Sequence, residues 1–328
     1  MTNNAFVVNK TEEGKFVSGI EEIEIPTIGD NEVLIKASYS SLNFKDALSS
    51  IGNPGVTRNF PHVTGIDVAG IIEESNSADF QKGDEVLVTG YDMGMNSDGG
   101  HQSFVKVPAS WVVKKPSEIT DKEIMTYGTA GLTAGLSVNE LILNGINVDS
   151  GEILVTGATG GVGSITVSIL SKLGFEVVAI SGKEDKIPFL KELGAKEVIL
   201  RKDFDIENKK PMMRERFAGV VDTVGGNILA EALKALKYDG VATCCGLTSS
   251  FKLDTNVFPF ILRGARLIGI DSVECKIEKK LAVWNKFEKD FKIDTLNEIT
   301  NEILLEDLPE AYQALLDGKA VGRYLVKI

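Results

Sequence analysis

Short runs of apolar and β-branched residues dominate the first hundred or so positions of the chain. Residues 33–37 (VLIKA), 68–72 (VAGII) and 85–88 (EVLV) are such runs, and turn-forming residues at 28–30 and 81–84 separate them. No helical period lasts long in this part of the sequence. The pattern therefore predicts a compact, barrel-like β domain.

Beyond Pro116 the pattern changes to strands that alternate with helices, and Asp121 is expected to cap the first of these helices. Six buried-type strands are predicted, at residues 153–156, 177–180, 197–200, 219–222, 240–243 and 267–270. Runs of β-branched residues that alternate with helices are typical of a parallel sheet covered on both faces. Residues 121–295 are therefore predicted to form one doubly wound α/β domain of the Rossmann type.

The last part of the chain breaks this rhythm. A short amphipathic helix is predicted at residues 308–316 and a final strand at 324–328. We expect residues 296–328 to return to the first domain and to complete it together with residues 1–120. The fold class is α/β, with a Rossmann domain and a smaller β-rich domain.

Composition and charge restrict the class of protein. The chain has 328 residues and a net charge of −12, so its surface repels nucleic acid and anionic lipid, and no basic patch offsets this. Neither nucleic acid nor a membrane is predicted as a partner. Three cysteines (Cys244, Cys245 and Cys275) make no disulfide framework, and the N-terminal sequence lacks the features of a signal peptide. A cytoplasmic location is expected.

The most specific motif is a glycine-rich turn at residues 155–164, VTGATGGVGS, between a predicted strand and a predicted helix. In this context backbone N–H groups can approach a pyrophosphate, and the helix N-terminus favours its negative charge. Gly160 is expected to allow that approach, and Gly163 is expected to allow close packing of helix on strand. Ala158 replaces the first glycine of the strict pattern. An ordinary turn without a ligand is the alternative.

The tip of the second predicted strand indicates which dinucleotide is bound. It carries Ser181, Gly182 and Lys183, where an NAD site usually has a carboxylate. A hydroxyl, a small residue and a cation suit a 2′-phosphate, and Arg201 could reach the same region, whereas Glu184 is the one nearby acid. The pattern favours NADPH, with a merely solvated Lys183 as the alternative.

Residues that could bind a metal are scarce. The chain has only two histidines, His62 and His101, and no cysteine before Cys244. No Cys-x-x-Cys or His-x-x-x-His spacing occurs, and no Gly-x-Ser-x-Gly motif indicates a hydrolase. Cys244 and Cys245 are interpreted as small buried hydrophobic residues. No metal site is predicted, which leaves a zinc-free enzyme that uses a reduced nicotinamide.

Several segments match a known family in the expected order along nearly the whole chain. They are residues 40–46, 58–61, 65–70, 128–131, 222–225, 259–263, 271–273 and 322–328. In these segments the chain resembles the YhdH/YhfP family, a zinc-independent, quinone oxidoreductase-like branch of the medium-chain dehydrogenase/reductase superfamily that includes acryloyl-CoA reductases. The resemblance implies a GroES-like catalytic domain, a Rossmann domain and a homodimer. Zinc-dependent relatives carry Gly-His-Glu at the position of Gly65, Ile66 and Asp67, and a cysteine near the position of Asn43.

The resemblance also implies a set of NADPH contacts. They are Phe44, Thr159, Gly160, Gly161, Val162, Gly163, Ser181, Gly182, Lys183, Arg201, Leu247, Ile261, Ser272 and Asp317. The family often has tyrosine at the position of Phe44, so a hydrogen bond from that hydroxyl is lost here. This weakens any role of position 44 as a proton donor.

The implied reaction moves a hydride from NADPH to the β-carbon of an activated double bond, after which the α-carbon is protonated. The enolate charge needs hydrogen-bond donors, and the resemblance places the loop of Asn43, Lys45 and Asp46 beside the nicotinamide. These are the candidate catalytic residues, although Lys45 could instead form an ion pair with Asp46. Asp67 is expected to support the structure.

Three arginines, Arg58, Arg263 and Arg323, are candidates for binding a phosphate or carboxylate of the substrate, and each could instead be structural. If Arg323 binds substrate, Arg323→Ala should raise the KM for an acyl-CoA and leave NADPH affinity unchanged.

Three functions remain open from the sequence. The first is reduction of a 2-enoyl thioester, with acryloyl-CoA as the leading substrate. The second is reduction of a quinone or a free enone, and the third is NADPH binding without turnover. The predicted strand at residues 267–270 could pair with a second copy across a two-fold axis.

Overall fold

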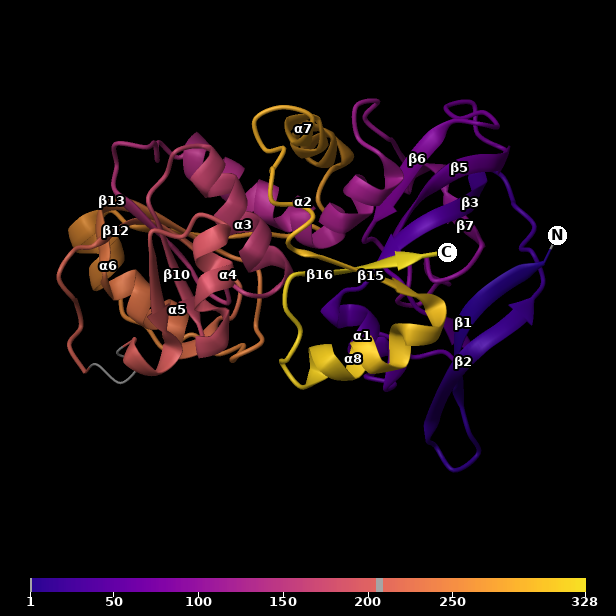
Figure 1. Cartoon of the computed structure of the whole chain (residues 1–328), viewed down its shortest axis with the longest axis horizontal. Coiled ribbons are helices and arrows are strands. Elements are labelled where there is room, and N and C mark those ends of the chain that lie inside the picture. The colour runs from indigo at the N-terminus through magenta and orange to yellow at the C-terminus, as the bar shows by residue number, and fades with distance from the viewer. Residues whose placement is uncertain (1, 205–208) are drawn as a thin grey trace. The chain divides into compact units, whose positions relative to one another are not determined.

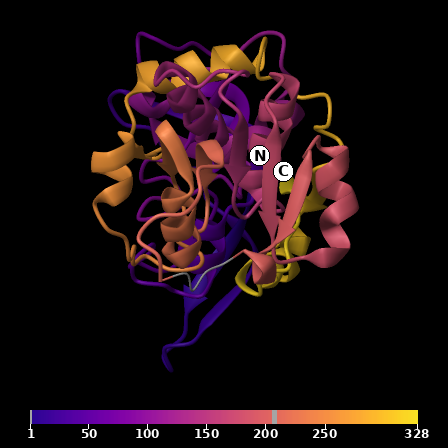
Figure 2. The same ribbon diagram turned by 90° about the vertical axis from the view of Figure 1, so that its left-hand side faces the viewer.

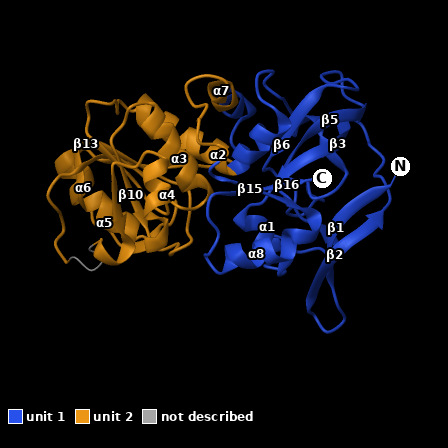
Figure 3. Cartoon of the chain, in the orientation of Figure 1, with its two compact units in different colours: residues 1–129, 273–282, 298–328 blue, residues 130–272, 283–297 orange. Residues whose placement is uncertain are grey.

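A computed structural model of the chain describes residues 2–204 and 209–328 (Figure 1). These residues form two compact units, which Figure 3 shows in separate colours. Unit 1 comprises residues 1–129, 273–282 and 298–328, and unit 2 comprises residues 130–272 and 283–297. None of the helices in the described part of the chain is long and apolar enough to span a membrane.

Unit 1 is the predicted β-rich domain. It contains a three-stranded sheet in the order β2-β1-β4 and a seven-stranded sheet in the order β15-β16-β3-β5-β6-β8, with β7 also paired to β3. Its strands are β1 (Asn3–Lys10), β2 (Phe16–Ile23), β3 (Glu32–Ser41), β4 (His62–Val63), β5 (Asp67–Ser75), β6 (Glu85–Thr89), β7 (Phe104–Pro108), β8 (Val113–Lys114), β15 (Thr300–Leu304) and β16 (Arg323–Lys327). Its complete helical elements are α1 (Phe44–Ser50), α8 (Leu308–Leu316) and the 3-10 turns η1 (Ala109–Trp111) and η4 (Leu305–Asp307).

The C-terminal tail returns to unit 1, as the break in the sequence pattern predicts. Strand β16 pairs antiparallel with β3, with Leu325 opposite Ser41, and β15 pairs parallel with β16. Alternate residues of these sheets point inward, so Val33, Ile35 and Val68 are fully buried in one apolar cluster.

Unit 2 is a Rossmann domain, which confirms the predicted fold class. Its six parallel strands lie in the order β11-β10-β9-β12-β13-β14, and helices lie on both sides of the sheet (Figure 2). The strands are β9 (Glu152–Val155), β10 (Val177–Ser181), β11 (Glu197–Leu200), β12 (Phe217–Asp222), β13 (Leu236–Cys244) and β14 (Arg266–Gly269). The helical elements are α3 (Gly161–Lys172), α4 (Ile187–Glu192), α5 (Gly226–Lys234), α6 (Phe258–Arg263), η2 (Glu184–Lys186) and η3 (Arg201–Asp203).

Two helices contain residues of both units: α2 (Asp121–Leu143) and α7 (Ile277–Phe287). The sequence placed the boundaries at 120/121 and 295/296, whereas residues 121–129 and 273–282 belong to unit 1. Lys280 explains why residues 273–282 belong to unit 1, because it is fully buried there. Its ammonium group donates to the carbonyls of Thr89 (2.7 Å) and Val273 (3.0 Å) and lies 3.5 Å from the centre of the Tyr91 ring.

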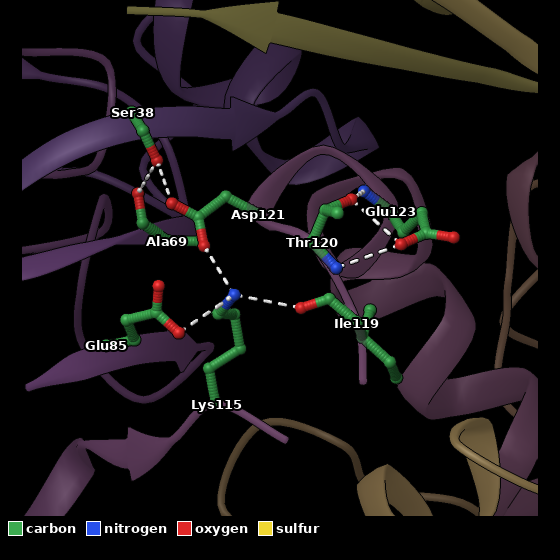
Figure 4. Close-up of polar contacts among 8 residues, drawn as sticks. All are labelled: Ser38, Ala69, Glu85, Lys115, Ile119, Thr120, Asp121 and Glu123. Carbon is green, nitrogen blue, oxygen red and sulfur yellow. Dashed lines mark hydrogen bonds and ion pairs between the residues drawn. The ribbon is translucent and has the colours of Figure 1, made fainter. Parts of the chain in front are cut away.

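The start of α2 is attached to unit 1 by a cluster of polar side chains, shown in Figure 4. The Lys115 ammonium lies 3.1 Å from one Asp121 oxygen, and the Ser38 hydroxyl donates to the other oxygen at 2.5 Å. The helix cap is Thr120, whose hydroxyl accepts from the Glu123 N–H (3.2 Å) while the Glu123 carboxylate accepts from the Thr120 N–H (2.9 Å). The predicted cap, Asp121, is therefore wrong by one residue, because its carboxylate binds Lys115 instead.

Both histidines of the chain are buried in unit 1. Nδ1 of His101 lies 2.9 Å from the Thr64 hydroxyl and 3.1 Å from the Tyr312 hydroxyl. Burial lowers the pKa of His101 to about 3 and also lowers the pKa of His62. The folded chain therefore keeps these imidazoles neutral at pH values at which the unfolded chain protonates them.

Below about pH 6.5 each histidine should lower the free energy of unfolding by up to about 1.4 kcal/mol per pH unit. Asp46, whose pKa burial raises to about 7, contributes with the opposite sign between about pH 7 and pH 4, so the slope of the wild-type protein is the sum of these contributions. Urea unfolding at a series of pH values measures this slope. His101→Gln removes one of the two groups and should make the slope shallower, whatever its effect on stability at neutral pH. An unchanged slope in this variant would contradict the conclusion that the His101 imidazole stays neutral in the folded chain.

Candidate active site and cofactor site

The glycine-rich turn joins β9 to α3, with Gly160 immediately before the helix. A Cβ at Gly163 would lie 2.4 Å from the Gly157 carbonyl oxygen and 2.7 Å from the Ala158 Cα, so helix and strand pack directly on this residue. Gly157 adopts a positive φ of 57°, which favours glycine. The first N–H groups of α3 have no acceptor within the helix and are available to an anion.

A buried carboxylate links the turn to the neighbouring strand. Asp222, at the end of β12, accepts hydrogen bonds from the Thr156 hydroxyl and from the Gly225 N–H, both at 2.7 Å. The Thr223 N–H donates to the Thr156 hydroxyl at 3.0 Å, and the Thr223 hydroxyl donates to the Thr156 carbonyl at 2.9 Å. Burial raises the pKa of Asp222. These bonds fix the carboxyl ends of β9 and β12, where the turn begins.

The residues predicted to bind a 2′-phosphate lie together at the ends of β10 and β11. The Ser181 hydroxyl accepts from the Lys183 N–H at 3.0 Å. A Cβ at Gly182 would lie 3.0 Å from an Arg201 guanidinium nitrogen, so the guanidinium lies against the glycine backbone. Glu184, the nearby acid, pairs with Lys202 at 3.2 Å. A hydroxyl and two cations beside a residue without a side chain suit a phosphate ester in charge.

The remaining predicted cofactor residues belong to other segments of unit 2 or to unit 1. Leu247 and Ile261 are 64% and 68% exposed in unit 2, and the buried Ser272 accepts from the Thr133 hydroxyl at 2.7 Å. Phe44 and Asp317 belong to unit 1. Lys319 donates to Asp317 at 2.8 Å, and this bond lowers the pKa of Asp317.

In unit 1, one buried carboxylate organises the predicted catalytic loop. One oxygen of Asp67 accepts from the Ser41 hydroxyl (2.5 Å), the Asn43 side-chain amide (2.7 Å) and the Thr129 N–H (2.9 Å). Its other oxygen accepts from the Thr129 hydroxyl at 2.5 Å. Asp67 is completely buried, and these contacts are those of a residue that supports the structure.

Asp46 holds the same loop from within. Its two oxygens accept the main-chain N–H groups of Asn43 (2.7 Å) and Ile66 (2.9 Å). Burial raises the pKa of Asp46 to about 7, and the nearby charge of Asp67 acts in the same direction. Because Asp46 is completely buried and occupied by the main chain, its geometry indicates a positioning role and does not support a catalytic one.

Lys45 differs from its neighbours in the loop. It is half-buried, and its ammonium group forms no hydrogen bond or ion pair with the residues that the structure describes. The possible ion pair with Asp46 does not form, because the Asp46 carboxylate faces the interior and binds main-chain N–H groups. Lys45 is thus available to a ligand, and its catalytic role remains a prediction.

The three arginines predicted to bind substrate differ in their exposure and in their hydrogen-bond partners. Arg58 is exposed and donates only weakly, to the Pro54 carbonyl at 3.3 Å. Arg263 donates to the main-chain carbonyls of Lys234 (2.9 Å), Leu236 (2.7 Å) and Met213 (2.6 Å). Its guanidinium is therefore committed to unit 2, and we correct its assignment to a structural role.

Arg323 is only 4% exposed, and its guanidinium donates to the Thr126 carbonyl (2.9 Å) and the Leu42 carbonyl (3.1 Å). The phosphates of CoA cannot reach a side chain this deeply buried, so this assignment is also corrected to a structural role. Desolvation lowers the pKa of Arg323, while the charges of Asp67 and Asp46 act against that shift.

Potential metal ligands do not cluster in the described residues, where no group of three His, Cys, Asp or Glu side chains is placed to hold an ion. Cys244 and Cys245 are half-buried rather than fully buried. Burial raises the pKa of the Cys245 thiol to about 12, which leaves it unreactive at neutral pH.

Comparison with known proteins agrees with this architecture. Residues 29–117 match the model of the alcohol dehydrogenase GroES-like domain, and residues 161–288 match a model described as zinc-binding dehydrogenase. These two descriptions correspond to the β-rich unit and the Rossmann unit. They define a two-domain protein of the dehydrogenase class.

Three relatives match nearly the whole chain. The putative quinone oxidoreductase YhfP of Bacillus subtilis is 42% identical over 94% of both chains, and its crystal structure with NAD bound has a TM-score of 0.96 at full coverage of both chains. The probable acrylyl-CoA reductase AcuI of Escherichia coli is 38% identical over 97% of both. The yhdH oxidoreductase of Salmonella enterica, in complex with NADP, has a TM-score of 0.95 and 38% identity over 99% of both chains. The chain belongs to the YhdH/YhfP family of the medium-chain dehydrogenase/reductase superfamily, a family of oxidoreductases.

Proposed function

We propose that the protein uses NADPH to reduce the carbon–carbon double bond of an α,β-unsaturated carbonyl compound, most favourably a 2-enoyl thioester such as acryloyl-CoA. The observation that carries the proposal is the group of Ser181, Gly182, Lys183 and Arg201 beside the glycine-rich turn. It occurs in a chain that aligns over 97% of its length with a relative named as an acrylyl-CoA reductase.

Unit 2 supplies the cofactor site in this proposal. The N-terminus of α3 binds the pyrophosphate, while Ser181, Lys183 and Arg201 bind the 2′-phosphate. NADPH, when bound, supplies the hydride that is added to the β-carbon. The buried Asp222 keeps the turn in place for this binding.

Unit 1 supplies the residues that meet the developing enolate. The Asn43 amide is bound to Asp67, so Lys45 is the better candidate to stabilise the carbonyl oxygen as charge develops on it. The new C–H bond at the β-carbon leaves an electron pair on the enolate, and a proton from solvent completes the reduction at the α-carbon. Phe44 has no hydroxyl and takes no part in this proton transfer.

A quinone or free enone is the second candidate substrate. It is favoured by the Bacillus relative, which is named a putative quinone oxidoreductase and is 42% identical. A protein that binds NADPH without turnover is the third possibility. All three functions are compatible with the same fold and cofactor site, so measurements of turnover must distinguish them.

The test is oxidation of NADPH by the purified protein, with acryloyl-CoA and a simple quinone in parallel and NADH as the cofactor control. Turnover of acryloyl-CoA with NADPH, and little with NADH, is the expected result. Turnover of the quinone alone would transfer the assignment to the second candidate. Binding of NADPH without reduction of either compound would contradict the proposed substrate class.

The cofactor preference gives a separate prediction. Lys183→Ala and Arg201→Ala should each raise the Kd for NADPH about tenfold, equivalent to about 1.4 kcal/mol, because each removes a charge-assisted bond to the 2′-phosphate. The Kd for NADH should stay unchanged. Lys196→Ala is a matched control, since Lys196 precedes β11 and pairs with Glu176 at 2.7 Å. Equal losses for NADPH and NADH would contradict the assignment.

We also propose that the protein is a cytoplasmic homodimer. Strand β14 lies at the edge of the six-stranded sheet, and β13 is the one strand of the described residues that pairs with it, so its outer backbone groups can pair with a second copy. Three free cysteines are consistent with a reducing compartment. Sedimentation equilibrium of the purified protein tests the dimer, and a strictly monomeric mass would contradict it.

A further inference from the structure

Helix α2 is interrupted at Gly128, whose φ of 51° and ψ of −155° are far from helical values. A Cβ at this position would lie 2.3 Å from the Ser41 hydroxyl, 2.7 Å from an Asp67 oxygen and 3.0 Å from an Arg323 nitrogen. Both the backbone conformation and the available space therefore require glycine here. The interruption lies directly against the polar groups that support the loop of Asn43, Lys45 and Asp46.

The interruption turns the next residue, Thr129, toward Asp67. The main-chain N–H and the hydroxyl of Thr129 bind the two oxygens of that carboxylate, at 2.9 Å and 2.5 Å. An uninterrupted helix would direct this N–H to a carbonyl four residues earlier. The same carboxylate holds Ser41 and Asn43, so Asp67 connects α2 directly to the loop.

We propose that Thr129, presented by the interruption at Gly128, is a positioning residue that acts through Asp67 to hold Asn43 and Lys45 in place for the reduction. The reduction itself is the function proposed above. Asp67 accepts four hydrogen bonds, two from Thr129, one from Ser41 and one from Asn43. The two bonds from Thr129 hold the carboxylate in the orientation that also binds Ser41 and Asn43. Without the threonine hydroxyl, one Asp67 oxygen loses the hydrogen bond from Thr129. The Asp67 side chain can then rotate away from Asn43.

The test compares Thr129→Val, which removes the hydroxyl but keeps the shape, with Thr129→Ser, which keeps the hydroxyl. Thr129→Val should lower kcat at least about tenfold and leave the Kd for NADPH unchanged, because the cofactor phosphates bind in unit 2. It should also speed hydrogen exchange at the Asp46 N–H, which donates to the Asn43 carbonyl at 3.0 Å. Thr129→Ser should restore both kcat and exchange protection.

Thr126→Val is the matched control on the same helix. The Thr126 hydroxyl is also buried, but it donates to the Lys122 carbonyl and does not touch Asp67. An equal loss of kcat in Thr126→Val and Thr129→Val, or unchanged kcat and exchange in Thr129→Val, would overturn the proposal. Should the wild-type protein reduce none of the compounds, the proposed function fails, and exchange at Asp46 alone decides whether Thr129 holds the loop.

Discussion

Arg323→Ala is expected to lower the free energy of unfolding by about 3 kcal/mol or more, because it leaves two buried carboxylates without a buried cation. The guanidinium donates to the carbonyls of Thr126 and Leu42. The carboxylates of Asp67 and Asp46 are also close enough to affect the pKa of Arg323. Alanine removes all of these contacts together. Urea unfolding followed by circular dichroism measures the change.

Arg58→Ala is the control for this prediction. Arg58 is exposed and makes one long hydrogen bond, so its removal should change the free energy of unfolding by no more than about 0.5 kcal/mol. The sequence led us to expect that Arg323→Ala raises the KM for an acyl-CoA in an otherwise intact enzyme. That result, with wild-type stability, would contradict the structural role.

Arg323 also illustrates where sequence reasoning ends. Arginine is seldom fully buried, so a lone arginine in a C-terminal motif is first interpreted as a ligand-binding residue. Its burial depends on carbonyls at Leu42 and Thr126, which lie far away in the sequence. No local pattern carries information about such a contact. The same holds for Arg263, whose partners are main-chain carbonyls of other segments.

The features that the sequence did predict are local ones. The strands of unit 2 appear as short β-branched runs, because a strand buried on both faces needs apolar residues at every position. The glycine-rich turn and the Ser181, Gly182 and Lys183 set are likewise contiguous in the chain. Their arrangement around Arg201 follows from the parallel sheet, which places the carboxyl ends of β10 and β11 side by side.

Contacts between distant polar residues were missed for the opposite reason. Thr156 and Asp222 are separated by 66 positions, and nothing in the neighbouring sequence indicates that they bind. Residues 273–282 were predicted as part of the Rossmann domain, whereas the structure groups them with unit 1, and the burial of Lys280 in this segment has no signal in the neighbouring sequence. Burial of a charged residue depends on partners that only the folded chain provides.

Gly163→Ala should damage both the stability of unit 2 and its affinity for NADPH. The added methyl group meets the Gly157 carbonyl oxygen at 2.4 Å and the Ala158 Cα at 2.7 Å. These are main-chain atoms, which cannot rotate aside as a flexible side chain does, so α3 must move away from the turn. Overpacking of this kind costs about 1–3 kcal/mol, and displacement of the α3 N-terminus should raise the Kd for NADPH at least about tenfold.

Gly160→Ala separates the two effects within the same turn. Its φ of −80° suits any residue, and a Cβ there would have the Gly157 carbonyl oxygen, at 3.3 Å, as its one close neighbour. We therefore expect stability within about 0.5 kcal/mol of wild type. Affinity for NADPH should nevertheless fall, because the methyl group occupies the space through which the backbone approaches the pyrophosphate. Thermal unfolding and NADPH titration of both variants check this division.

Equal stability of Gly163→Ala and wild type would show that the helix adapts and that close packing is not what Gly163 provides. Unchanged NADPH affinity in Gly160→Ala would place the pyrophosphate away from this turn.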